Sequence, residues 1–352
     1  MTGDDAVMAR ERILSSESQA EDAEEPRRGA GGESTGSEGA PAVRPRTIAE
    51  YVGQSALIER LTIALEAVRR RDEAMEHLLL HGPPGLGKTT LAHVVAEEMG
   101  TKAWVTSGPA LTKAADLVGT LTKLGPGDIL FIDEIHRLPA SVEEYIYPAM
   151  EDFKVDFTVD SGMHAKVISL TLKPFTLIGA TTRAGMLTQP MRARFGITHH
   201  LEYYPVEDLV AILRRAADRL SIDAVKDEGF DAIASRSRGT PRVALRLLRR
   251  VRDFAQVRGR GVVDVAAVAD ALELEGVDDL GLDEIDRKYI RVLAEVYEGG
   301  PAGLEAIAAT MGDDPGTLED VVEPYLLQIG FLARTPRGRK LTAAGAASMP
   351  AP

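Results

Sequence analysis

The chain of 352 residues contains no cysteine, a single tryptophan and no long run of apolar residues. Without cysteine it cannot form disulfides, use a catalytic thiol or bind zinc through thiolates. No stretch is long and apolar enough to predict a membrane span, and the beginning of the chain lacks the apolar core of a secretory signal. We therefore expect a cytoplasmic protein that does not use a membrane.

The chain also has fewer basic than acidic residues, with 41 Lys and Arg against 54 Asp and Glu, which gives a net charge of −13. This balance argues against a surface that binds nucleic acid everywhere, so any such binding needs a local basic patch. The length and the 44% hydrophobic content are sufficient for two or three domains. Residues 1–43 are rich in Glu, Ser, Gly and Ala without a sustained apolar period, which predicts a disordered acidic tail.

The most informative motif is Gly-x-x-x-x-Gly-Lys-Thr at 82–89, between an apolar run at 78–81 and an amphipathic stretch at 91–99. This order predicts a strand, a phosphate-binding loop and a helix. Backbone N–H groups of such a loop surround phosphate oxygens, Lys88 supplies a cation for the β- and γ-phosphates, and the Thr89 hydroxyl is a ligand for Mg²⁺. An incidental glycine-rich turn is disfavoured by the strand and helix on its two sides.

A second motif follows the apolar run at 129–132, which ends in Asp133 and Glu134. Asp133 could hold Mg²⁺ through its water shell, and Glu134 could polarise the water that attacks the γ-phosphate. The alternative is an ordinary solvated helix start, which becomes less attractive beside a phosphate loop. Together the two motifs predict ATP binding and hydrolysis with Mg²⁺ as cofactor.

Strands and helices alternate from about 44 to 204, as an α/β fold with helices on both faces of a parallel sheet requires. The strands are expected at 78–81, 103–106, 129–133 and 176–181. Thr181 ends the fourth strand at the edge where nucleotides bind open sheets. Its hydroxyl could sense the γ-phosphate or simply cap the strand.

Residues 153–170 contain apolar and polar residues in alternation around Ser161-Gly162, which is typical of a β-hairpin. Two interpretations remain open for this segment. It could form an edge of the main sheet, or it could project and present apolar residues to a partner.

Three arginines are candidates for contact with phosphate. Thr240 and Pro241 predict an N-cap and first turn of a helix, where a cation opposes the helix dipole, so Arg242 makes better sense facing a phosphate than solvent. Arg194 follows the fourth strand and could reach the nucleotide of a neighbouring subunit as an arginine finger. Arg192 is a competing candidate for that role, and a solvated helix face is the alternative for both.

The C-terminal part predicts a winged-helix module. A largely helical stretch at 205–275 ends in a boundary at 276–281, and helical patterns then follow at 286–297, 304–311 and 317–329. Residues 331–342 predict a strand, a turn and a second strand, with four cations within seven residues. This is the basic patch that the acidic chain needs for DNA. Some winged-helix modules bind proteins instead.

Taken together, these motifs resemble the RuvB family, AAA+ ATPases that drive branch migration of Holliday junctions in bacterial recombination and repair. The resemblance covers nearly all of the chain from about Val43 onward. It is carried by segments at 44–54, 82–90, 131–138, 147–153, 179–185, 194–196, 239–242 and 334–339. The phosphate loop and the Asp-Glu pair are common to AAA+ proteins, whereas the segments at 179–185 and 334–339 are more specific.

The resemblance implies an AAA+ P-loop core at 44–204, a helical lid domain at 205–277 and a winged-helix head domain at 278–352. It also implies a homo-hexameric ring around double-stranded DNA at a four-way junction, with RuvA and RuvC as partners and the hairpin beginning at Phe153 docking on RuvA.

Site roles are carried over by the same resemblance. Val43 and Arg44 would contact the base region, and Gly85, Gly87, Lys88, Thr89 and Thr90 the phosphates. Glu151, Asp152, Phe153, Tyr204 and Arg242 would line the nucleotide site, with Arg242 as second sensor. Thr181 would be the first sensor, Arg194 the finger that acts in trans, and Arg334 and Arg339 the DNA contacts. The tail before Val43 is outside the family pattern, and the hairpin tip lies in its variable part.

Two other functions share some of these features. A clamp-loader-like ATPase would be expected to end in a helical collar instead of a basic wing. An ATP-switched regulator would use the winged helix to recognise one DNA sequence, whereas a motor should bind the DNA backbone in a salt-sensitive way.

Overall fold

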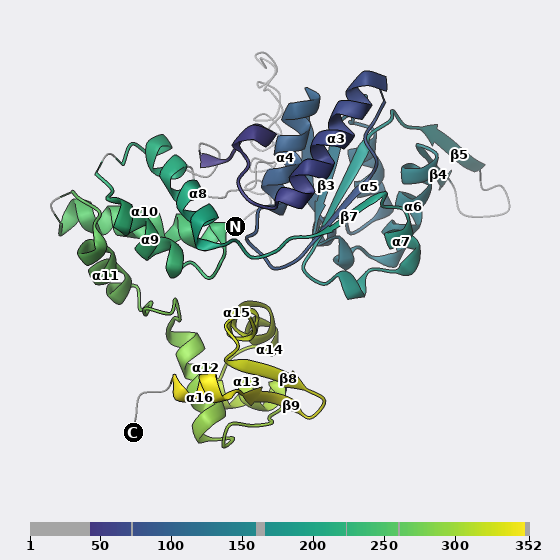
Figure 1. The fold of residues 1–352 in the computed structure, drawn as a ribbon. Coiled ribbons are helices and arrows are strands. Elements are labelled where there is room, and N and C mark those ends of the chain that lie inside the picture. The colour runs from purple at the N-terminus through teal and green to yellow at the C-terminus, as the bar shows by residue number, and fades with distance from the viewer. Residues whose placement is uncertain (1–42, 72, 160–165, 223, 260, 349–352) are drawn as a thin grey trace, which may run out of the picture. The chain divides into compact units, whose positions relative to one another are not determined.

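The computed structural model describes residues 43–348 except 72, 160–165, 223 and 260 (Figure 1). The predicted acidic tail before Val43 and the tip of the predicted hairpin therefore lie outside the described residues. Within the described part, no helix is both long and apolar enough to cross a membrane.

A five-stranded parallel sheet forms the centre of the N-terminal part, in the order β2-β3-β6-β1-β7. Its strands are β1 (Leu78–His81), β2 (Ala103–Ser107), β3 (Ile129–Asp133), β6 (Thr176–Thr181) and β7 (Ile197–His200). The four predicted strands are confirmed, with β2 one residue longer than expected. Strand β6 is buried at every position, as a central parallel strand covered on both faces should be.

Helices cover both faces of this sheet because successive strand residues point to opposite sides. Leu80 and Phe131 pack into an apolar cluster with α3 (Ser55–Arg71) and α4 (Lys88–Met99). Leu79 and Leu130 pack into a second cluster with α5, α6 and α7. The helices of that second face are α5 (Ala114–Leu121), α6 (Ala140–Glu151) and α7 (Gln189–Ala193), and the short 3-10 turns are η1 (Ile48–Glu50), η2 (Gly108–Ala110), η3 (Ile135–Arg137) and η4 (Ala184–Met186).

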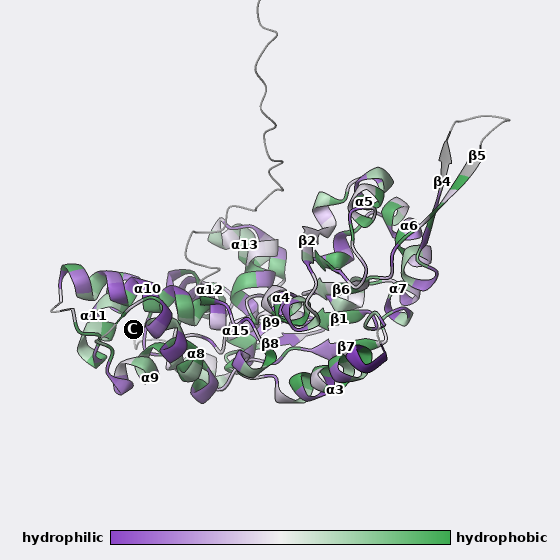
Figure 2. Ribbon diagram, turned by 90° about the horizontal axis from the view of Figure 1, so that it is seen from above, coloured by the Kyte–Doolittle hydropathy of each residue, from purple (hydrophilic) through white to green (hydrophobic). Residues whose placement is uncertain are grey.

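The predicted hairpin forms from β4 (Lys154–Val159) and β5 (Lys166–Thr171), paired in antiparallel register. These strands make a two-stranded sheet of their own, so the interpretation as an edge of the main sheet is wrong. The hairpin stands clear of the main sheet when seen from above (Figure 2). Val155, at its base, is fully buried in the second apolar cluster, whereas Ile168, further along the same face, is 45% exposed.

Four helices follow the sheet, namely α8 (Val206–Arg219), α9 (Asp227–Ser235), α10 (Pro241–Val257) and α11 (Val265–Leu274). Their buried residues, such as Leu213 and Leu248, join the same apolar cluster as α3 and α4. Thr240 occupies the N-cap position of α10 as predicted, but its side chain makes no capping bond. The hydroxyl donates instead to the Arg238 carbonyl at 3.1 Å, because Arg238 and Gly239 turn the chain through positive φ just before the helix.

The C-terminal part has an apolar cluster of its own, built from residues between Leu282 and Leu341. Its elements are α12 (Glu284–Glu295), α13 (Leu304–Met311), α14 (Pro315–Thr317), η5 (Leu318–Val322), α15 (Glu323–Gln328), β8 (Leu332–Thr335), β9 (Gly338–Leu341) and α16 (Ala343–Ala347). The predicted helical segment at 317–329 is confirmed as α14, η5 and α15 in direct succession, with η5 a π-helical turn that the sequence pattern did not indicate. The strand, turn and strand of the predicted wing are confirmed as β8 and β9.

Candidate functional site

The phosphate loop connects β1 to α4 and is shaped by glycines with positive φ. Gly82, Gly85 and Gly87 have φ values of 138°, 82° and 95°, a region that side chains with a Cβ rarely enter. Lys88 begins α4 and is only 7% exposed, and its Nζ donates to the carbonyls of Gly82 at 2.9 Å and Pro83 at 2.8 Å. The loop thus places a buried cation at a helix N-terminus, which fits the phosphates of a nucleotide.

The charge of Lys88 interacts with the two carboxylates at the end of β3. Burial lowers the pKa of Lys88, while the carboxylates of Asp133 and Glu134 raise it again. Oxygen ligands suit Mg²⁺, and Asp133 and Thr89 supply them beside the loop. These residues fit a magnesium nucleotide.

Glu134 lies in the left-handed region with φ of 48°, which is unusual for a residue with a side chain and costs about 1–3 kcal/mol. Its carboxylate oxygen Oε2 accepts a hydrogen bond from the Thr182 hydroxyl at 3.3 Å and lies 3.2 Å from His136 Nδ1. Strain of this kind is concentrated at functional sites because the surrounding contacts fix one geometry.

Thr181 is fully buried at the end of β6, with its Oγ1 2.8 Å from His136 Nδ1. The same Oγ1 accepts a hydrogen bond from the Arg183 N–H at 3.0 Å. Its hydroxyl therefore both caps the strand end and contacts the ring that touches Glu134. His136 was not predicted from the sequence, although a polar ring two residues beyond an Asp-Glu pair was a usable signal.

The predicted base-contacting residues, Val43 and Arg44, lie beside the helix α8. Val43 is buried, and the Arg44 carbonyl accepts a hydrogen bond from Arg219 Nη1 at 2.6 Å. Tyr204 Oη donates to the Leu86 carbonyl at 3.3 Å. Tyr204 is thereby attached directly to the phosphate loop.

Tyr51 is a further residue beside the loop that sequence reasoning did not single out. Its Oη lies 3.2 Å from Tyr204 Oη, and a Cβ added to Gly87 would lie 3.0 Å from it. Burial raises the pKa of Tyr51 well above its ordinary value, so the phenol stays protonated and can act as a donor.

Arg242 lies in the first turn of α10, against the loop. Its backbone N–H donates to the Gly85 carbonyl at 3.3 Å, and a Cβ added to Gly85 would lie 3.0 Å from the Arg242 Cβ. The guanidinium is exposed, and its charge contributes to the lowering of the pKa of Lys88. The structure therefore brings Arg242 to the phosphate loop from a helix far along the chain.

Arg194 belongs to a separate group at the end of α6. Its Nη2 lies 3.2 Å from Glu151 Oε1, and its guanidinium carbon lies 4.3 Å from the centre of the Tyr147 ring. Asp152 and Phe153 follow directly along the chain. Within the described residues, no hydrogen bond or ion pair joins this group to Lys88.

Arg192, the competing finger candidate, is exposed and donates through Nη2 to the Leu187 carbonyl at 3.1 Å. Both arginines therefore bind a carbonyl of their own segment, since Arg194 Nη1 donates to the Pro190 carbonyl at 2.8 Å. Arg194 in addition contacts the side chains of Glu151 and Tyr147 on α6. The two arginines thus differ in surroundings as well as in position.

The wing carries Arg334 and Arg339, which lie directly opposite each other in the β8–β9 ladder. Both guanidinium groups contact Glu323, a fully buried carboxylate at the start of α15. Sequence reasoning missed Glu323, because the predicted helical segment also contains Glu319 and Asp320 and no sequence signal separates the three carboxylates.

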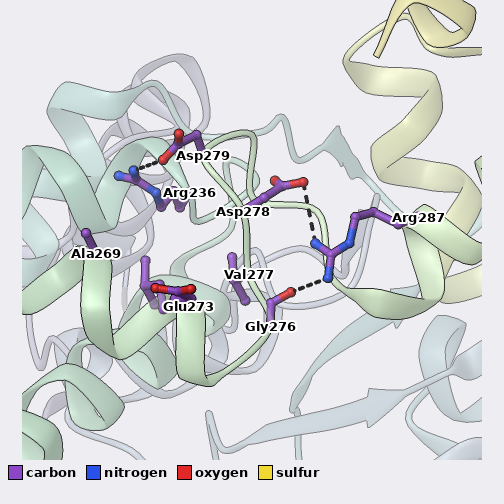
Figure 3. Close-up of a pocket in the computed structure, with 9 residues that line it drawn as sticks. Arg236, Ala269, Glu273, Gly276, Val277, Asp278, Asp279 and Arg287 are labelled. Carbon is purple, nitrogen blue, oxygen red and sulfur yellow. Dashed lines mark hydrogen bonds and ion pairs between the residues drawn. The ribbon is translucent and has the colours of Figure 1, made fainter. Parts of the chain in front are cut away.

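A hollow of about 380 Å³ lies away from the phosphate loop, beside α11 and α12 (Figure 3). Its arginines are already engaged, since Arg236 pairs with Asp279 and Arg287 donates to the Gly276 carbonyl at 2.8 Å. The nucleotide residues described above are not among those that line it. We therefore assign the nucleotide to the loop and not to this hollow.

A parallel sheet with a phosphate loop after β1, an Asp-Glu pair after β3, an arginine on a helical lid and a C-terminal winged helix defines an ATPase of the AAA+ class. Family models then identify the branch of that class. Residues 43–201 match the Holliday junction DNA helicase RuvB P-loop domain, 204–278 the RuvB AAA lid domain and 279–349 the RuvB C-terminal winged helix domain. The chain belongs to the RuvB family.

Individual relatives agree with this assignment. The Holliday junction branch migration complex subunit RuvB of Ligilactobacillus salivarius is 54% identical over 302 residues, which cover 86% of this chain and 90% of that protein. The same subunit of Oenococcus oeni is 56% identical over 302 residues, covering 86% and 89%. A solved structure of the Thermotoga maritima RuvB Holliday junction branch migration motor has 47% identity and a TM-score of 0.79, covering 87% of this chain and 97% of that one.

Proposed function

We infer that this chain is the ATP-driven motor subunit that moves Holliday junctions during homologous recombination and DNA repair. The observation that carries the inference is the presence, in one chain of the RuvB family, of a complete phosphate loop and a winged helix with two arginines on its wing. We propose that it works as a hexameric ring around duplex DNA.

In this proposal ATP is hydrolysed at the phosphate loop. Lys88 and the backbone around Gly85, Gly87 and Thr90 bind the phosphates, and Thr89 and Asp133 hold Mg²⁺, which neutralises charge on the phosphates. Glu134 polarises the attacking water and Thr181 senses the γ-phosphate, supported by the contacts of both residues with His136. Val43 and Arg44 contact the base region, and Tyr204 lines the nucleotide site.

Arg194 is proposed to complete the site of the neighbouring subunit. Its separation from Lys88 and its contact with Glu151 support a role in trans, with Asp152 and Phe153 at the same interface. A guanidinium that arrives beside the transferring phosphoryl group stabilises the charge of the transition state.

Arg242 is proposed to transmit hydrolysis to the lid. It lies at the N-terminus of α10 and contacts the phosphate loop through Gly85, so the loss of the γ-phosphate changes the contacts of a lid helix directly. Rotation of the lid would then move the head that holds DNA.

The proposed partners are RuvA, through the hairpin of β4 and β5, and RuvC, by family resemblance. The apolar face of the hairpin continues from buried Val155 to exposed Ile168, which supports a docking role. Arg334 and Arg339 would contact the phosphates of DNA.

The test is dissociation of a synthetic four-way junction by the wild type, Lys88→Ala and Lys123→Ala, each with ATP and with or without cognate RuvA. Lys123 is an exposed lysine away from the loop and serves as the matched control. We expect the wild type and Lys123→Ala to move the junction, far better with RuvA, and Lys88→Ala to fail.

A different outcome would redirect the assignment. If ATP is hydrolysed while the junction stays untouched under all conditions, the clamp-loader or regulator function takes precedence. A large affinity ratio between one DNA sequence and random duplex would select the regulator.

A further inference from the structure

Two like charges face each other on the wing. Arg334 and Arg339 are direct cross-strand partners in the β8–β9 ladder, which places both side chains on one face of a two-stranded ribbon. Like charges in this arrangement repel and destabilise the pair. Something must compensate this repulsion for the two guanidinium groups to stay together.

Glu323 supplies the compensation from beneath the wing. Its Oε2 accepts from Arg334 Nε at 2.8 Å and lies 2.6 Å from Arg334 Nη2, and its Oε1 accepts from Arg339 Nε at 2.8 Å. The fourth donor is the hydroxyl of Tyr289, 3.0 Å from Oε1. A carboxylate offers about four acceptor positions, so this one is saturated.

The location of the carboxylate makes it rigid. Glu323 and Tyr289 are both fully buried, and Tyr289 belongs to the apolar cluster of the C-terminal part. A π-helical turn ends directly before Glu323. π-helical turns are frequent at functional sites. The side chain of Arg334 is 45% exposed and that of Arg339 is 19% exposed, so the arginines reach the surface while their anchor stays inside.

We propose that Glu323 is a positioning residue for DNA binding, which holds the guanidinium groups of Arg334 and Arg339 in the geometry that a DNA phosphate backbone requires. Tyr289 fixes the orientation of the Glu323 carboxylate through its hydrogen bond to Oε1. Glu323 uses the Nε edge of each arginine, and Glu319 Oε1 lies 3.7 Å from Arg339 Nη2. Among the described residues, Nη1 of each group makes no hydrogen bond, so it can reach a phosphate oxygen. The proposal rests on the proposed DNA-binding role of the wing.

The effect of net charge and the effect of positioning change the affinity for DNA in opposite directions when Glu323 loses its charge. Removing one negative charge from the head should by itself strengthen binding to a polyanion. Removing the anchor should weaken it, because each freed arginine must be ordered again when it binds DNA. The substitution Glu323→Gln therefore separates the two effects.

The experiment measures the affinity of the full chain for a labelled random-sequence duplex over a range of salt concentrations. Glu323→Gln is expected to weaken binding about tenfold. Glu305→Gln, which removes an exposed carboxylate elsewhere on the head, is the control and should leave binding unchanged or slightly stronger.

A background without the two arginines tests whether Glu323 acts through them. In the variant Arg334→Ala/Arg339→Ala, adding Glu323→Gln should change affinity less than about twofold. An equal loss in both backgrounds would mean that Glu323 only supports the fold, and no loss in the wild-type background would also overturn the proposal. If Glu323→Gln does not fold, as judged by urea denaturation, Tyr289→Phe replaces it and must show the same dependence on the arginines.

Failure of the underlying function gives a different result. If Arg334→Ala and Arg339→Ala themselves leave DNA affinity and its salt dependence unchanged, the wing does not bind phosphates and the proposed site is wrong. If they weaken binding while Glu323→Gln does not, the DNA site stands and only the positioning role is lost.

Discussion

The imidazole of His77 is held by the backbone on both sides. Its Nδ1 accepts a hydrogen bond from the Leu177 N–H at 2.9 Å, and its Nε2 lies 3.0 Å from the Met150 carbonyl. These contacts require a neutral ring that is protonated on Nε2. Burial lowers the pKa of His77 below its ordinary value, although the Met150 carbonyl and Glu76 partly oppose the shift.

A pH dependence of stability follows from this ring. Between the lowered pKa of folded His77 and the ordinary value of about 6.5, the unfolded chain binds more protons, so the free energy of unfolding decreases as the pH falls. His77→Gln retains a donor and an acceptor but does not titrate, so its urea midpoint should fall less than that of the wild type between about pH 7.5 and about pH 5.5.

Thr198→Gln is the control, because Thr198 is exposed on the edge strand β7 and does not titrate. It should keep the pH dependence of the wild type. Identical pH dependence in His77→Gln and the wild type would show that the ring is not the titrating group.

Arg242 tests the link between hydrolysis and movement. Arg242→Ala should retain some nucleotide binding, because Lys88 remains, but should lose junction movement by about tenfold or more, an effect of at least about 1.4 kcal/mol. Nucleotide binding, ATPase and junction dissociation would be measured together. Arg246→Ala, an exposed position on the same helix, should behave as the wild type, and normal ATPase and movement in Arg242→Ala would contradict the assignment.

Single residues differ in how far the sequence could predict them. Lys88, Asp133 and Thr181 belong to linear motifs or strand ends, so their placement near one another follows from chain order and the parallel sheet. His136 and Tyr51 contact Thr181 and Tyr204 through the fold alone. Glu323 could not be assigned a role from the sequence, because its hydrogen bonds to Arg334 and Arg339 form only when α15 packs against the strands of the wing.

At the scale of elements, the hairpin offers the sharpest test, since its two faces differ. Ile168→Asp places a charge on the apolar face and should weaken stimulation by RuvA about tenfold, because a buried isoleucine contributes about 1.5–3 kcal/mol. Stimulation of ATPase by RuvA would be measured at a fixed concentration. Basal ATPase should be unchanged, because the hairpin is not part of the main sheet.

Ser169→Asp introduces the same charge one position along β5, on the opposite face of the strand. It should leave stimulation by RuvA nearly intact. Equal losses in Ile168→Asp and Ser169→Asp would rule out the apolar face as the docking surface.

Strands and helices with a strong local sequence pattern could be predicted, whereas elements with a weak pattern could not. Three of the four predicted strands are central in the sheet, and β2, at one edge, begins with the apolar run Ala-Trp-Val. The strand β7, at the other edge, has the sequence Ile-Thr-His-His with alternating partial exposure. Its pairing with β1 depends on tertiary contact and has no strong sequence signal. The π-helical turn in η5 was missed for a similar reason, since helical periodicity alone does not distinguish it from α-helix.

At the scale of the whole molecule, the proposed ring can be tested by mixing two inactive subunits. Lys88→Ala lacks the loop cation, and Arg194→Ala lacks the finger. If Arg194 acts in trans, random mixing in equal amounts creates intact interfaces at about a quarter of the positions, so about a quarter of the wild-type ATPase should return when sites act independently. ATPase of the mixture would be compared with that of each variant alone.

The control mixture combines Lys88→Ala with the double variant Lys88→Ala/Arg194→Ala, in which no intact loop exists. It should remain inactive. Failure of the first mixture to recover, although both variants assemble into rings, would place Arg194 outside the neighbouring site.

The apolar cluster of the C-terminal part, closed between Leu282 and Leu341, has a consequence for inheritance. In the proposed ring, a substitution that loosens this cluster should leave the other two apolar clusters packed, so the altered subunit is expected to bind ATP and enter the ring without holding DNA. A cell with one normal and one such defective gene would build mixed rings, and each would contain subunits that cannot hold their substrate. Damage of this kind should be genetically dominant, whereas a mutation that unfolds the ATPase core should be recessive.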